Sequence, residues 1–389
     1  MSTHRSSPTI RAAALLALAC GLVVEAQTPT GWGDPAQAFV FRAAPETAVE
    51  LAGRDFSRTQ INVRGAVAVV ELRCRLTLVN RSDRVLRSVT LAIQSAPGLP
   101  GGKATVMAPS LAVAKDEEFA VDVNLRLVRP LPAPGAPLAE MTVDGVLYAD
   151  LSFRGPDASA ARRRMTLFEL EARRDRQRLA AVLAEQGGEA LRKEALAALD
   201  RQASQPALEA RLAGGDGRAI SPAVESSLRP VELASLEVDE TPLELLEGAA
   251  RVAGARAMSP TLEVRNVSGK AIRDFEVGWV VNDRAGRRYA AGAIPSTGGP
   301  LQAGDRGRVD SQRLFEFRTA AAEPFEIGGM SGYVRRVEFV DGSFWIPSRK
   351  ALDAAALLDV EPPSSEEARL ATIYRRQGLQ GLINELGRF

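Results

Sequence analysis

The sequence predicts a mainly β protein made of two similar halves, each a β-sandwich of antiparallel strands followed by a helical segment. Three observations predict this fold. A strand–turn–strand segment occurs twice, a helical stretch occurs after each copy, and no helices alternate with the strands inside the β-rich regions. Strands that run on without intervening helices favour two packed sheets over a parallel sheet.

The repeated strand–turn–strand segment is the clearest internal similarity. "RLTLVNRSDRVLRSVTL" in the first half aligns with "TLEVRNVSGKAIRDFEV" in the second, which pairs Asn80 with Asn266 and Ser82 with Ser268. Asparagine tolerates the left-handed backbone of a turn, and serine can bond the turn backbone. Each copy therefore predicts two strands joined by an Asn-x-Ser turn.

A second recurring pattern is Val-Asp-Gly, at Val143-Asp144-Gly145 and again at Val340-Asp341-Gly342. Asp-Gly between two β-rich runs is typical of a hairpin, because both turn positions need positive φ. The pattern predicts equivalent hairpin turns in the two halves.

A helical stretch also occurs twice, as "RLAAVLAEQGGEALRKE" (Arg178 to Glu194) and "RLATIYRRQGLQGLINE" (Arg369 to Glu385). Gly187-Gly188 is expected to separate two helices in the first copy. Ser364 or Ser365 is expected to cap the C-terminal helices, with glutamates in the first turn. Such short helices are not stable alone, so we expect them to dock on a sandwich, on each other or on a partner.

The N-terminus is typical of an export signal. A basic start with Arg5 and Arg11 precedes an apolar stretch, Ala12 to Val24, that is too short to span a bilayer comfortably. We expect cleavage after Ala26. The alternatives are a retained anchor helix and a lipoprotein attached through Cys20.

The 389-residue chain has room for two or three domains. The predicted segments are a signal peptide (1–26), a flexible mature N-terminus (27–35), β-sandwich 1 (36–156), a helical linker (157–214), β-sandwich 2 (225–350) and a C-terminal helical segment (351–389).

Further features of the second half support a family resemblance. After its Asn-x-Ser turn come a hairpin, "VNDRAGRR" (Val281 to Arg288), and the stretch "PLQAGDRGRV" (Pro300 to Val309). This pattern is similar to small immunoglobulin-like modules of bacterial exported proteins, the FxLYD-type and related domains. It covers mainly residues 262–317 and, more weakly, the first half. The resemblance implies tandem immunoglobulin-like sandwiches with an envelope or extracellular role, and it implies no catalytic residues.

The scarcity of histidine excludes several chemistries. The single histidine, His4, lies in the predicted signal, which excludes Ser-His-Asp and Cys-His catalysis and imidazole-built zinc sites in the mature chain. The 49 Lys plus Arg against 48 Asp plus Glu argue against a nucleic-acid partner. Cys74, which alternates with charged residues, is expected as a buried structural thiol without a disulfide.

The remaining acids and aromatics predict no site. Four aspartates offer loop oxygens for a calcium site, but we expect turn and cap roles for Asp283, Asp305, Asp310 and Asp341. Trp279 and Trp345 are expected to fill a core. The charged stretch "EARRDRQR" is expected as a solvated helix face, with contact to anionic phospholipid or an acidic partner as the alternative. The sequence thus predicts no catalytic, cofactor-binding or metal-ligating residue.

The leading functional prediction is a non-catalytic protein of the bacterial envelope, periplasmic or extracellular, that binds or scaffolds a protein partner through sheet edges or loops. It contacts the membrane only through a lipid at Cys20, as an outer-membrane lipoprotein, or through an uncleaved signal. The alternative is a metal- or carboxylate-dependent hydrolase with accessory sandwiches.

Overall fold

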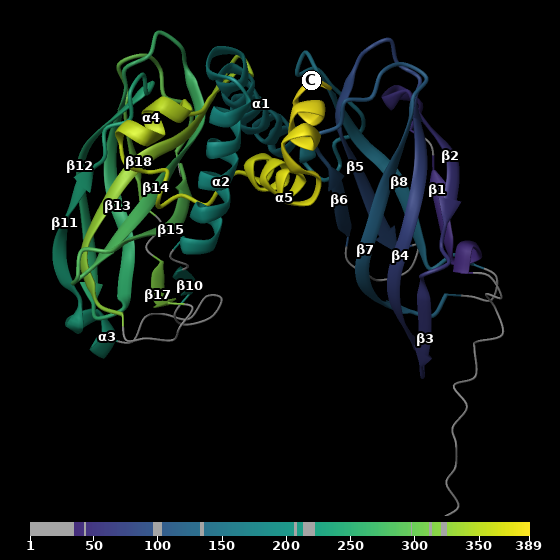
Figure 1. The fold of residues 1–389 in the computed structure, drawn as a ribbon. Coiled ribbons are helices and arrows are strands. Elements are labelled where there is room, and N and C mark those ends of the chain that lie inside the picture. Colours follow the sequence, from purple (N-terminus) through teal and green to yellow (C-terminus); the bar gives the residue numbers. More distant parts are fainter. Residues whose placement is uncertain are drawn as a thin grey trace, which may run out of the picture.

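The computed structural model describes residues 35–42, 44–95, 103–132, 136–205, 208–212, 222–296, 298–310, 313–319 and 325–389. The predicted signal peptide, its cleavage site, His4 and Cys20 lie outside the described residues. Figure 1 shows a mainly β protein, with one β region on each side and helices between them.

The described residues of the first β region form a five-stranded and a four-stranded sheet. The five-stranded sheet contains β1 (Phe39–Arg42), β8 (Ala139–Tyr148), β5 (Leu86–Ser95) and β6 (Ala104–Ala108) in that order, with β9 (Phe153–Arg154) on β8. The other sheet contains β2 (Val49–Asp55), β3 (Gln60–Arg64), β4 (Val67–Asn80) and β7 (Glu118–Pro130). One hydrophobic cluster draws side chains from both sheets.

The described residues of the second β region form one ten-stranded sheet. Its path is β10 (Leu208–Leu212), β17 (Leu314–Thr319), β13 (Arg256–Asn266), β12 (Leu243–Ala253), β11 (Arg229–Ser235), β18 (Ile327–Phe339), β14 (Ile272–Asp283) and β15 (Arg288–Pro295). Off this path, β16 (Arg306–Val309) pairs with β13 and β19 (Phe344–Trp345) pairs with β18. The two ends of the path, β10 and β15, contact each other.

The prediction of purely antiparallel strands is wrong at one position in each region. β1 runs parallel to β8, and residues 233–235 of β11 run parallel to β18. The first half of β11 pairs antiparallel with β12, as β2 does with β4. In the second region the single strand β11 therefore pairs with both sets of strands. In the first region the two sets stay in separate sheets, one with β1 and the other with β2.

Alternation along β4 places Cys74 as predicted. Leu72, Cys74 and Leu76 are buried, whereas Arg73 and Arg75 face outward. Burial raises the pKa of the Cys74 thiol to about 12, with smaller contributions from Asp122 and Asp55. The thiol is therefore protonated at neutral pH, as a structural cysteine should be.

β14 is instead buried on both faces. Val277, Trp279 and Val281 pack in the core of the β region. On the opposite face, Val280 packs with Tyr333 against the short helix Arg349–Ala354 that follows the sheet. A strand covered on both faces loses its alternation and becomes a continuous apolar run. Trp279 fills this core as predicted.

The first Asn-x-Ser turn is held by one buried side chain. The Nδ2 atom of Asn80 donates to the carbonyl oxygens of Arg84 at 2.8 Å, Val113 at 3.0 Å and Ala114 at 3.3 Å. Its Oδ1 atom accepts from the backbone N–H and the hydroxyl of Ser82. Asn80 thus fixes both the turn and the loop beside it.

The second turn repeats this pattern bond for bond. The Nδ2 atom of Asn266 donates to the carbonyl oxygens of Lys270 at 2.9 Å, Leu301 at 3.1 Å and Gln302 at 3.0 Å. Its Oδ1 atom accepts from the backbone N–H and the hydroxyl of Ser268. Both asparagines have 0% exposure, so neither turn has water available as a substitute partner.

The two Asp-Gly pairs are not equivalent, contrary to prediction. Asp341-Gly342 is a hairpin turn, with Gly342 at φ 82° and the carboxylate of Asp341 accepting from the N–H of Ser343 at 2.8 Å. Asp144 and Gly145 instead lie inside β8. A side chain at Gly145 would collide with the ring of Phe153, 2.3 Å from its added Cβ, so glycine is needed there for packing.

In the first half, the turn that matches Asp341-Gly342 lies a few residues after Asp144-Gly145. The carboxylate of Asp150 accepts from the N–H of Ser152 at 3.0 Å, and Leu151 takes the left-handed position at φ 63°. The Asp144 carboxylate instead accepts from the N–H of Ala158 at 2.8 Å and so anchors the segment leading into the helices.

The helices differ from prediction mainly at one boundary. They are α1 (Ala161–Gln186), α2 (Gly188–Ser204), α3 (Pro222–Ser227), α4 (Arg349–Ala354) and α5 (Ser365–Leu386), with short 3-10 turns at Pro35–Ala38 and Pro45–Thr47. Residues 208–212, expected to be helical, form β10 because they pair with β17. Ser364 caps α5 as predicted by accepting from the N–H of Glu367 at 3.0 Å.

Both helical segments bend at matching glycines. Gly187 separates α1 from α2 at φ 83° and ψ −177°, and Gly378 kinks α5 at φ 70° and ψ −169°. This region of backbone space is accessible essentially to glycine alone. The glycine therefore lets each segment fold back on itself as a helical hairpin.

We expect Asn80→Ala to lower the free energy of unfolding by about 3 kcal/mol, because three carbonyl groups lose a buried donor. Asn266→Ala should cost a similar amount, and Ser82→Ala, with its partly exposed hydroxyl, clearly less. Urea unfolding checks the series. A loss below about 1 kcal/mol for both asparagine variants would contradict the assigned role.

We expect Gly187→Ala to destabilise the helical segment by about 1–3 kcal/mol through backbone strain. Nothing lies within 4 Å of the added Cβ, so a steric clash is not the cause. Gly188→Ala is the matched control, because this neighbour has helical geometry and alanine favours a helix. Thermal unfolding measures both, and equal effects at the two positions would refute the explanation.

Candidate functional site

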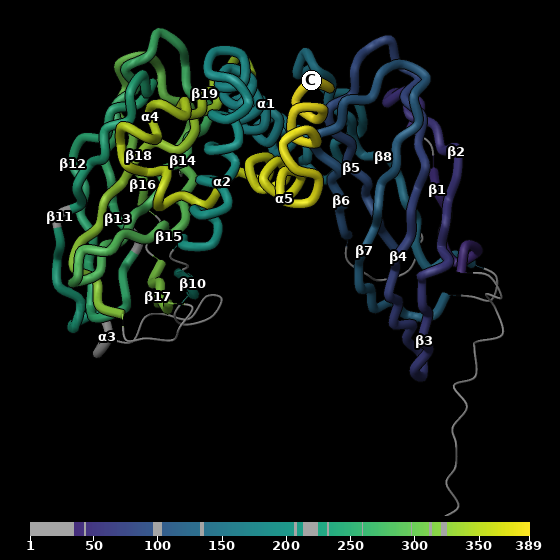
Figure 2. Tube along the Cα trace, viewed as in Figure 1, coloured from purple at the N-terminus to yellow at the C-terminus, as the bar shows by residue number. Residues whose placement is uncertain are grey.

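The helical segments contact both β regions and form the candidate site. Figure 2 follows the chain from the second β region through α5, whose yellow end lies beside the blue strands of the first region. α5 contacts both α1 and α2. Ala161 and Met165, at the start of α1, also pack on the first region, against Leu147 of β8.

An apolar cluster joins the two segments. It is made of Val182, Leu191, Ala195, Leu370 and Leu382, with the half-buried Leu179, Leu183, Ala190, Ile373, Tyr374, Leu379, Ile383 and Leu386 around it. The sequence expectation that these helices dock rather than stand alone is confirmed: each segment buries its apolar face against the other.

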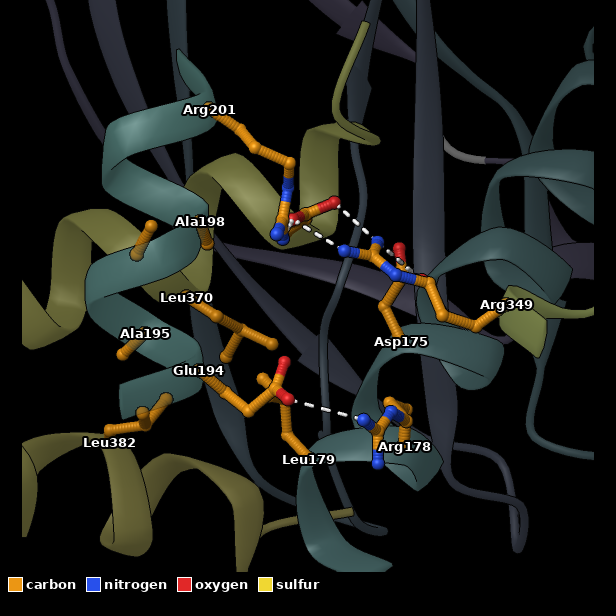
Figure 3. A pocket seen from close by; sticks show the side chains of 12 residues that line it. Asp175, Arg178, Leu179, Glu194, Ala195, Ala198, Arg201, Arg349, Leu370 and Leu382 are labelled. Atoms are coloured by element: carbon orange, nitrogen blue, oxygen red, sulfur yellow. Dashed lines mark hydrogen bonds and ion pairs between the residues drawn. The ribbon is translucent and has the colours of Figure 1, made fainter. Parts of the chain in front are cut away.

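Figure 3 shows a cavity between α1, α2 and α5. Its volume of about 30 Å³ accommodates about one water molecule. Leu179, Leu370 and Leu382 form its apolar side. A space of this size does not admit a substrate. The charged side chains around it are bound mainly to one another.

Glu367 is the centre of the charges beside this cavity. Its carboxylate accepts from Arg349 at 2.6 and 3.0 Å and from Arg201 at 2.5 Å, so it joins α4, α2 and α5. Burial alone would raise the pKa of Glu367, but the hydrogen bonds and charges of Arg349 and Arg201 outweigh burial and hold the pKa below its usual value.

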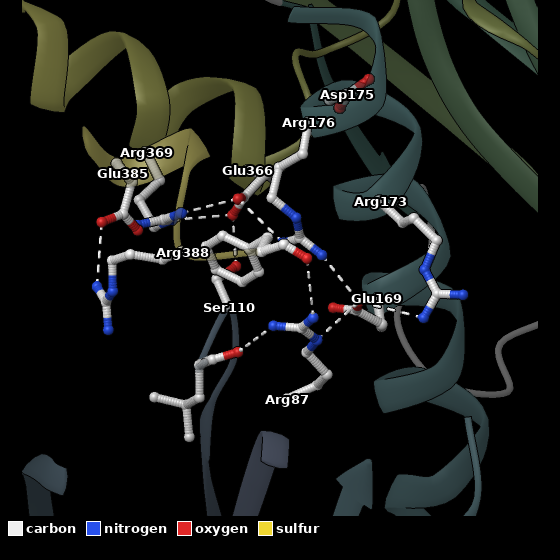
Figure 4. A network of polar contacts seen from close by, with 12 residues as sticks. Arg87, Ser110, Glu169, Arg173, Asp175, Arg176, Glu366, Arg369, Glu385 and Arg388 are labelled. Atoms are coloured by element: carbon white, nitrogen blue, oxygen red, sulfur yellow. Dashed lines mark hydrogen bonds and ion pairs between the residues drawn. The ribbon is translucent and has the colours of Figure 1, made fainter. Parts of the chain in front are cut away.

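Figure 4 shows a second charged cluster around Glu366, whose side chain has 0% exposure. Glu366 accepts from Arg176 at 3.1 Å, from Arg369 at 2.8 and 2.9 Å, and from the hydroxyl of Ser110. Burial by itself would raise the pKa of Glu366, but Arg369, Ser110 and Arg176 outweigh it and lower the pKa. Ser110 belongs to the first β region, so α5 reaches across to the opposite half.

Glu169 extends this cluster along α1. It accepts a hydrogen bond from Arg176 at 2.8 Å and lies 3.6 Å from Arg173 and 3.8 Å from Arg87. The ring of Phe389 lies 4.0 Å from the Arg176 guanidinium and 4.8 Å from that of Arg87, both favourable cation–π distances.

α1 reaches the second β region in turn. Arg163 forms ion pairs with Asp274 and, at 3.1 Å, with Glu338. Further along the helix, Arg174 donates to the carbonyl oxygen of Pro347 at 3.2 Å. Each helical segment therefore binds its own β region and the other one.

Matching ion pairs occupy matching places in the two helical repeats. Arg178 pairs with Glu194 at 3.1 Å, and Arg369 pairs with Glu385 at 2.5 Å. Each pair consists of the first and the last residue of one of the two similar stretches of sequence. The sequence similarity thus extends to a shared contact across each bend.

The four aspartates considered for calcium lie in separate local settings. Asp283 accepts from the N–H and Nε of Arg287, Asp305 from the N–H of Gln302, Asp341 pairs with Lys270 at 2.8 Å, and Asp310 lies 3.6 Å from Arg308. The expected turn and cap roles are confirmed for Asp283, Asp305 and Asp341. Within the described ranges, no group of three or more acids, cysteines or histidines is placed to hold a metal.

The expectation of a solvated face for "EARRDRQR" is wrong for part of this stretch. Asp175 and Arg176 are 4% and 5% exposed. Asp175 binds the hydroxyl of Ser364, and Arg176 binds Glu366, so the partners come from far along the chain. In the sequence, this burial is indicated by the position of these two charges just before the repeated helical stretch that begins at Arg178.

The comparisons with known proteins name no relative. No family model matches the chain, and no curated protein matches it. A β-glucosidase from Kluyveromyces marxianus is 10% identical over 70% of this chain and 45% of that one, with a TM-score of 0.15. A transglutaminase from red sea bream is 12% identical over 77% of this chain and 31% of that one, with a TM-score of 0.12. A solved structure named pT26-6p is 8% identical over 88% of this chain and 73% of that one, with a TM-score of 0.15.

This chain spans less than half the length of those two enzymes. TM-scores of this size support no statement about the fold or function of this chain. Among the described helices, none is both long enough and apolar enough to cross a membrane.

We expect acid to weaken the helical core through Glu366 and Glu367. Their folded pKa values are lowered, so their stabilisation is present above the unfolded glutamate pKa of about 4.3 and is lost as pH falls through the folded values. Calorimetry from neutral to acidic pH should show a steep loss for the natural protein. The Glu366→Gln variant should be less stable at neutral pH and lose less with acid; an identical pH slope would contradict this assignment.

Proposed function

We propose that this chain is an exported, non-catalytic binding or scaffolding protein of the bacterial envelope, periplasmic or extracellular. In this proposal each β region is an immunoglobulin-like sandwich, the two arose by tandem duplication, and the interlocked helices hold them at a fixed separation. A protein partner then contacts both β regions at once. The observation that carries the proposal is the crossed contact of α1 and α5 with opposite halves.

The duplication is supported by local geometry that unrelated sequences would not share. The turns at Asn80 and Asn266 use the same set of hydrogen bonds. The helical bends at Gly187 and Gly378 adopt the same unusual backbone. The sandwich reading is supported by the single apolar cluster that both sheets of the first region share.

The non-catalytic reading is supported by how the buried acids are used. Glu366 and Glu367 are each bound by two arginines and have lowered pKa values. A general acid or base near neutral pH needs the opposite, a carboxyl with a raised pKa and access to substrate. These groups are suited to holding helices together. Burial does raise the pKa of one described carboxyl, Glu171 on α1, which is the observation open to the hydrolase alternative.

A rigid pair of β regions favours binding because a second contact made by the same molecule is effectively intramolecular. The gain in avidity requires that the separation match the partner and stay fixed. Edge strands such as β3 and β6, each paired on one side along its length, offer the backbone groups through which another chain can add a strand.

We expect deletion of residues 362–389 to abolish partner capture from native envelope extract after crosslinking, and to expose the apolar faces around Val182 and Leu191. A sharper variant is Glu366→Ala with Glu367→Ala, which releases the helices while leaving the β strands intact. Arg376→Ala, exposed on α5, is the matched control. Dye binding to apolar surface and quantitative pull-down give the readouts.

Unchanged capture and unchanged stability after deletion would refute the scaffolding proposal. Stoichiometric metal in the purified mature protein, or turnover of a hydrolase substrate that is lost on mutation of one aspartate, would replace it with the hydrolase alternative.

A further inference from the structure

A cleft of about 340 Å³ lies between the first β region and the helices, beside the cluster of Figure 4. Its charged lining consists of Arg87, Arg173, Arg176 and Glu169. The volume falls in the range of small-molecule sites. Unlike the cavity between the helices, this cleft has room for a ligand.

Arg87 is a buried cation with weak partners. It is 9% exposed, and its Nη atoms reach the carbonyl oxygen of Leu111 and a terminal carboxylate oxygen of Phe389 only at 3.4 Å. Its Nε atom has no hydrogen-bond partner among the described residues and lies 3.8 Å from Glu169. Ordinary hydrogen bonds of this kind are 2.7–3.2 Å long, so Arg87 is poorly satisfied.

The neighbouring arginines leave positive charge uncompensated. Glu169 is the single acidic side chain in the lining, the terminal carboxylate of Phe389 is the second negative group, and three arginines share the two. Arg176 is fully engaged with Glu169 and Glu366. Arg173, whose side chain is 34% exposed, donates one hydrogen bond among the described residues, to the carbonyl of Ala149 at 2.7 Å.

The remaining wall is largely apolar. Leu386, Ala180 and the ring of Phe389 complete the lining, and this ring lies against the guanidinium groups of Arg87 and Arg176. A guanidinium presents its donors in a planar fork that matches carboxylate and phosphate groups. The cleft thus combines a basic floor with an apolar side.

We propose that this cleft binds the oxyanion of a small carboxylate- or phosphate-bearing molecule, with Arg87 and Arg173 as its ligands and the Phe389 side against its apolar part. This site does not depend on the proposed scaffolding function, because it lies on one β region and the helices and needs no protein partner. The bound anion supplies Arg87 with an acceptor closer than its two present ones at 3.4 Å.

The test is calorimetric titration of the full chain with benzoate and, separately, with inorganic phosphate, against sodium chloride at equal ionic strength. We expect saturable binding of at least one anion at one site per chain. A preference for benzoate identifies an apolar carboxylate as the natural ligand class, and a preference for phosphate identifies a phosphorylated one.

Four variants locate the site. Arg173→Ala should weaken binding at least tenfold, and Arg87→Gln should do the same. Arg164→Ala, an exposed arginine on the same helix, should leave affinity unchanged. Glu169→Gln should tighten binding by removing the competing carboxylate, a gain that damage to the fold would not produce.

Absence of saturable binding for both anions would overturn the proposal. Binding that survives both Arg173→Ala and Arg87→Gln within twofold would overturn it equally, because the anion would then lie elsewhere.

Discussion

The fold depends on the constraint that a charged side chain buried away from water needs an oppositely charged partner. Glu366 has no solvent exposure and is bound by Arg176 of α1 and Arg369 of α5. Breaking such a pair by removing one partner commonly costs about 3–5 kcal/mol. Since the two helices belong to different halves of the sequence, this pairing joins the halves themselves.

The helical segments exchange contacts between the halves. α5 follows the second β region yet bonds Ser110 of the first, whereas α1 follows the first and pairs with Asp274 and Glu338 of the second. The apolar cluster between the helices supplies cohesion, and the ion pairs determine their alignment. The same arrangement leaves beside Arg87 a cleft whose side chains include three arginines and one glutamate.

Sequence reasoning succeeded where the signal was local and failed where partners were distant. The Asn80 and Asn266 turns, buried Cys74 and the cap at Ser364 follow from spacing and side-chain type alone. The Asp-Gly pairs were matched wrongly because a dipeptide does not show whether a turn or a packed ring demands the glycine. The burial of Arg176, the strand at 208–212 and the parallel pairing of β11 arise from contacts that no sequence window contains.

The most direct test of the interlocked helices is the distance between spin labels on the two β regions. Exposed Val128 and Val267, replaced by cysteine in a chain without Cys20 and Cys74, report on the first and second region. Pulsed electron resonance should give one narrow distance distribution at neutral pH, which broadens in Glu366→Ala. A broad distribution in the natural background would show that the β regions move independently and would contradict the account.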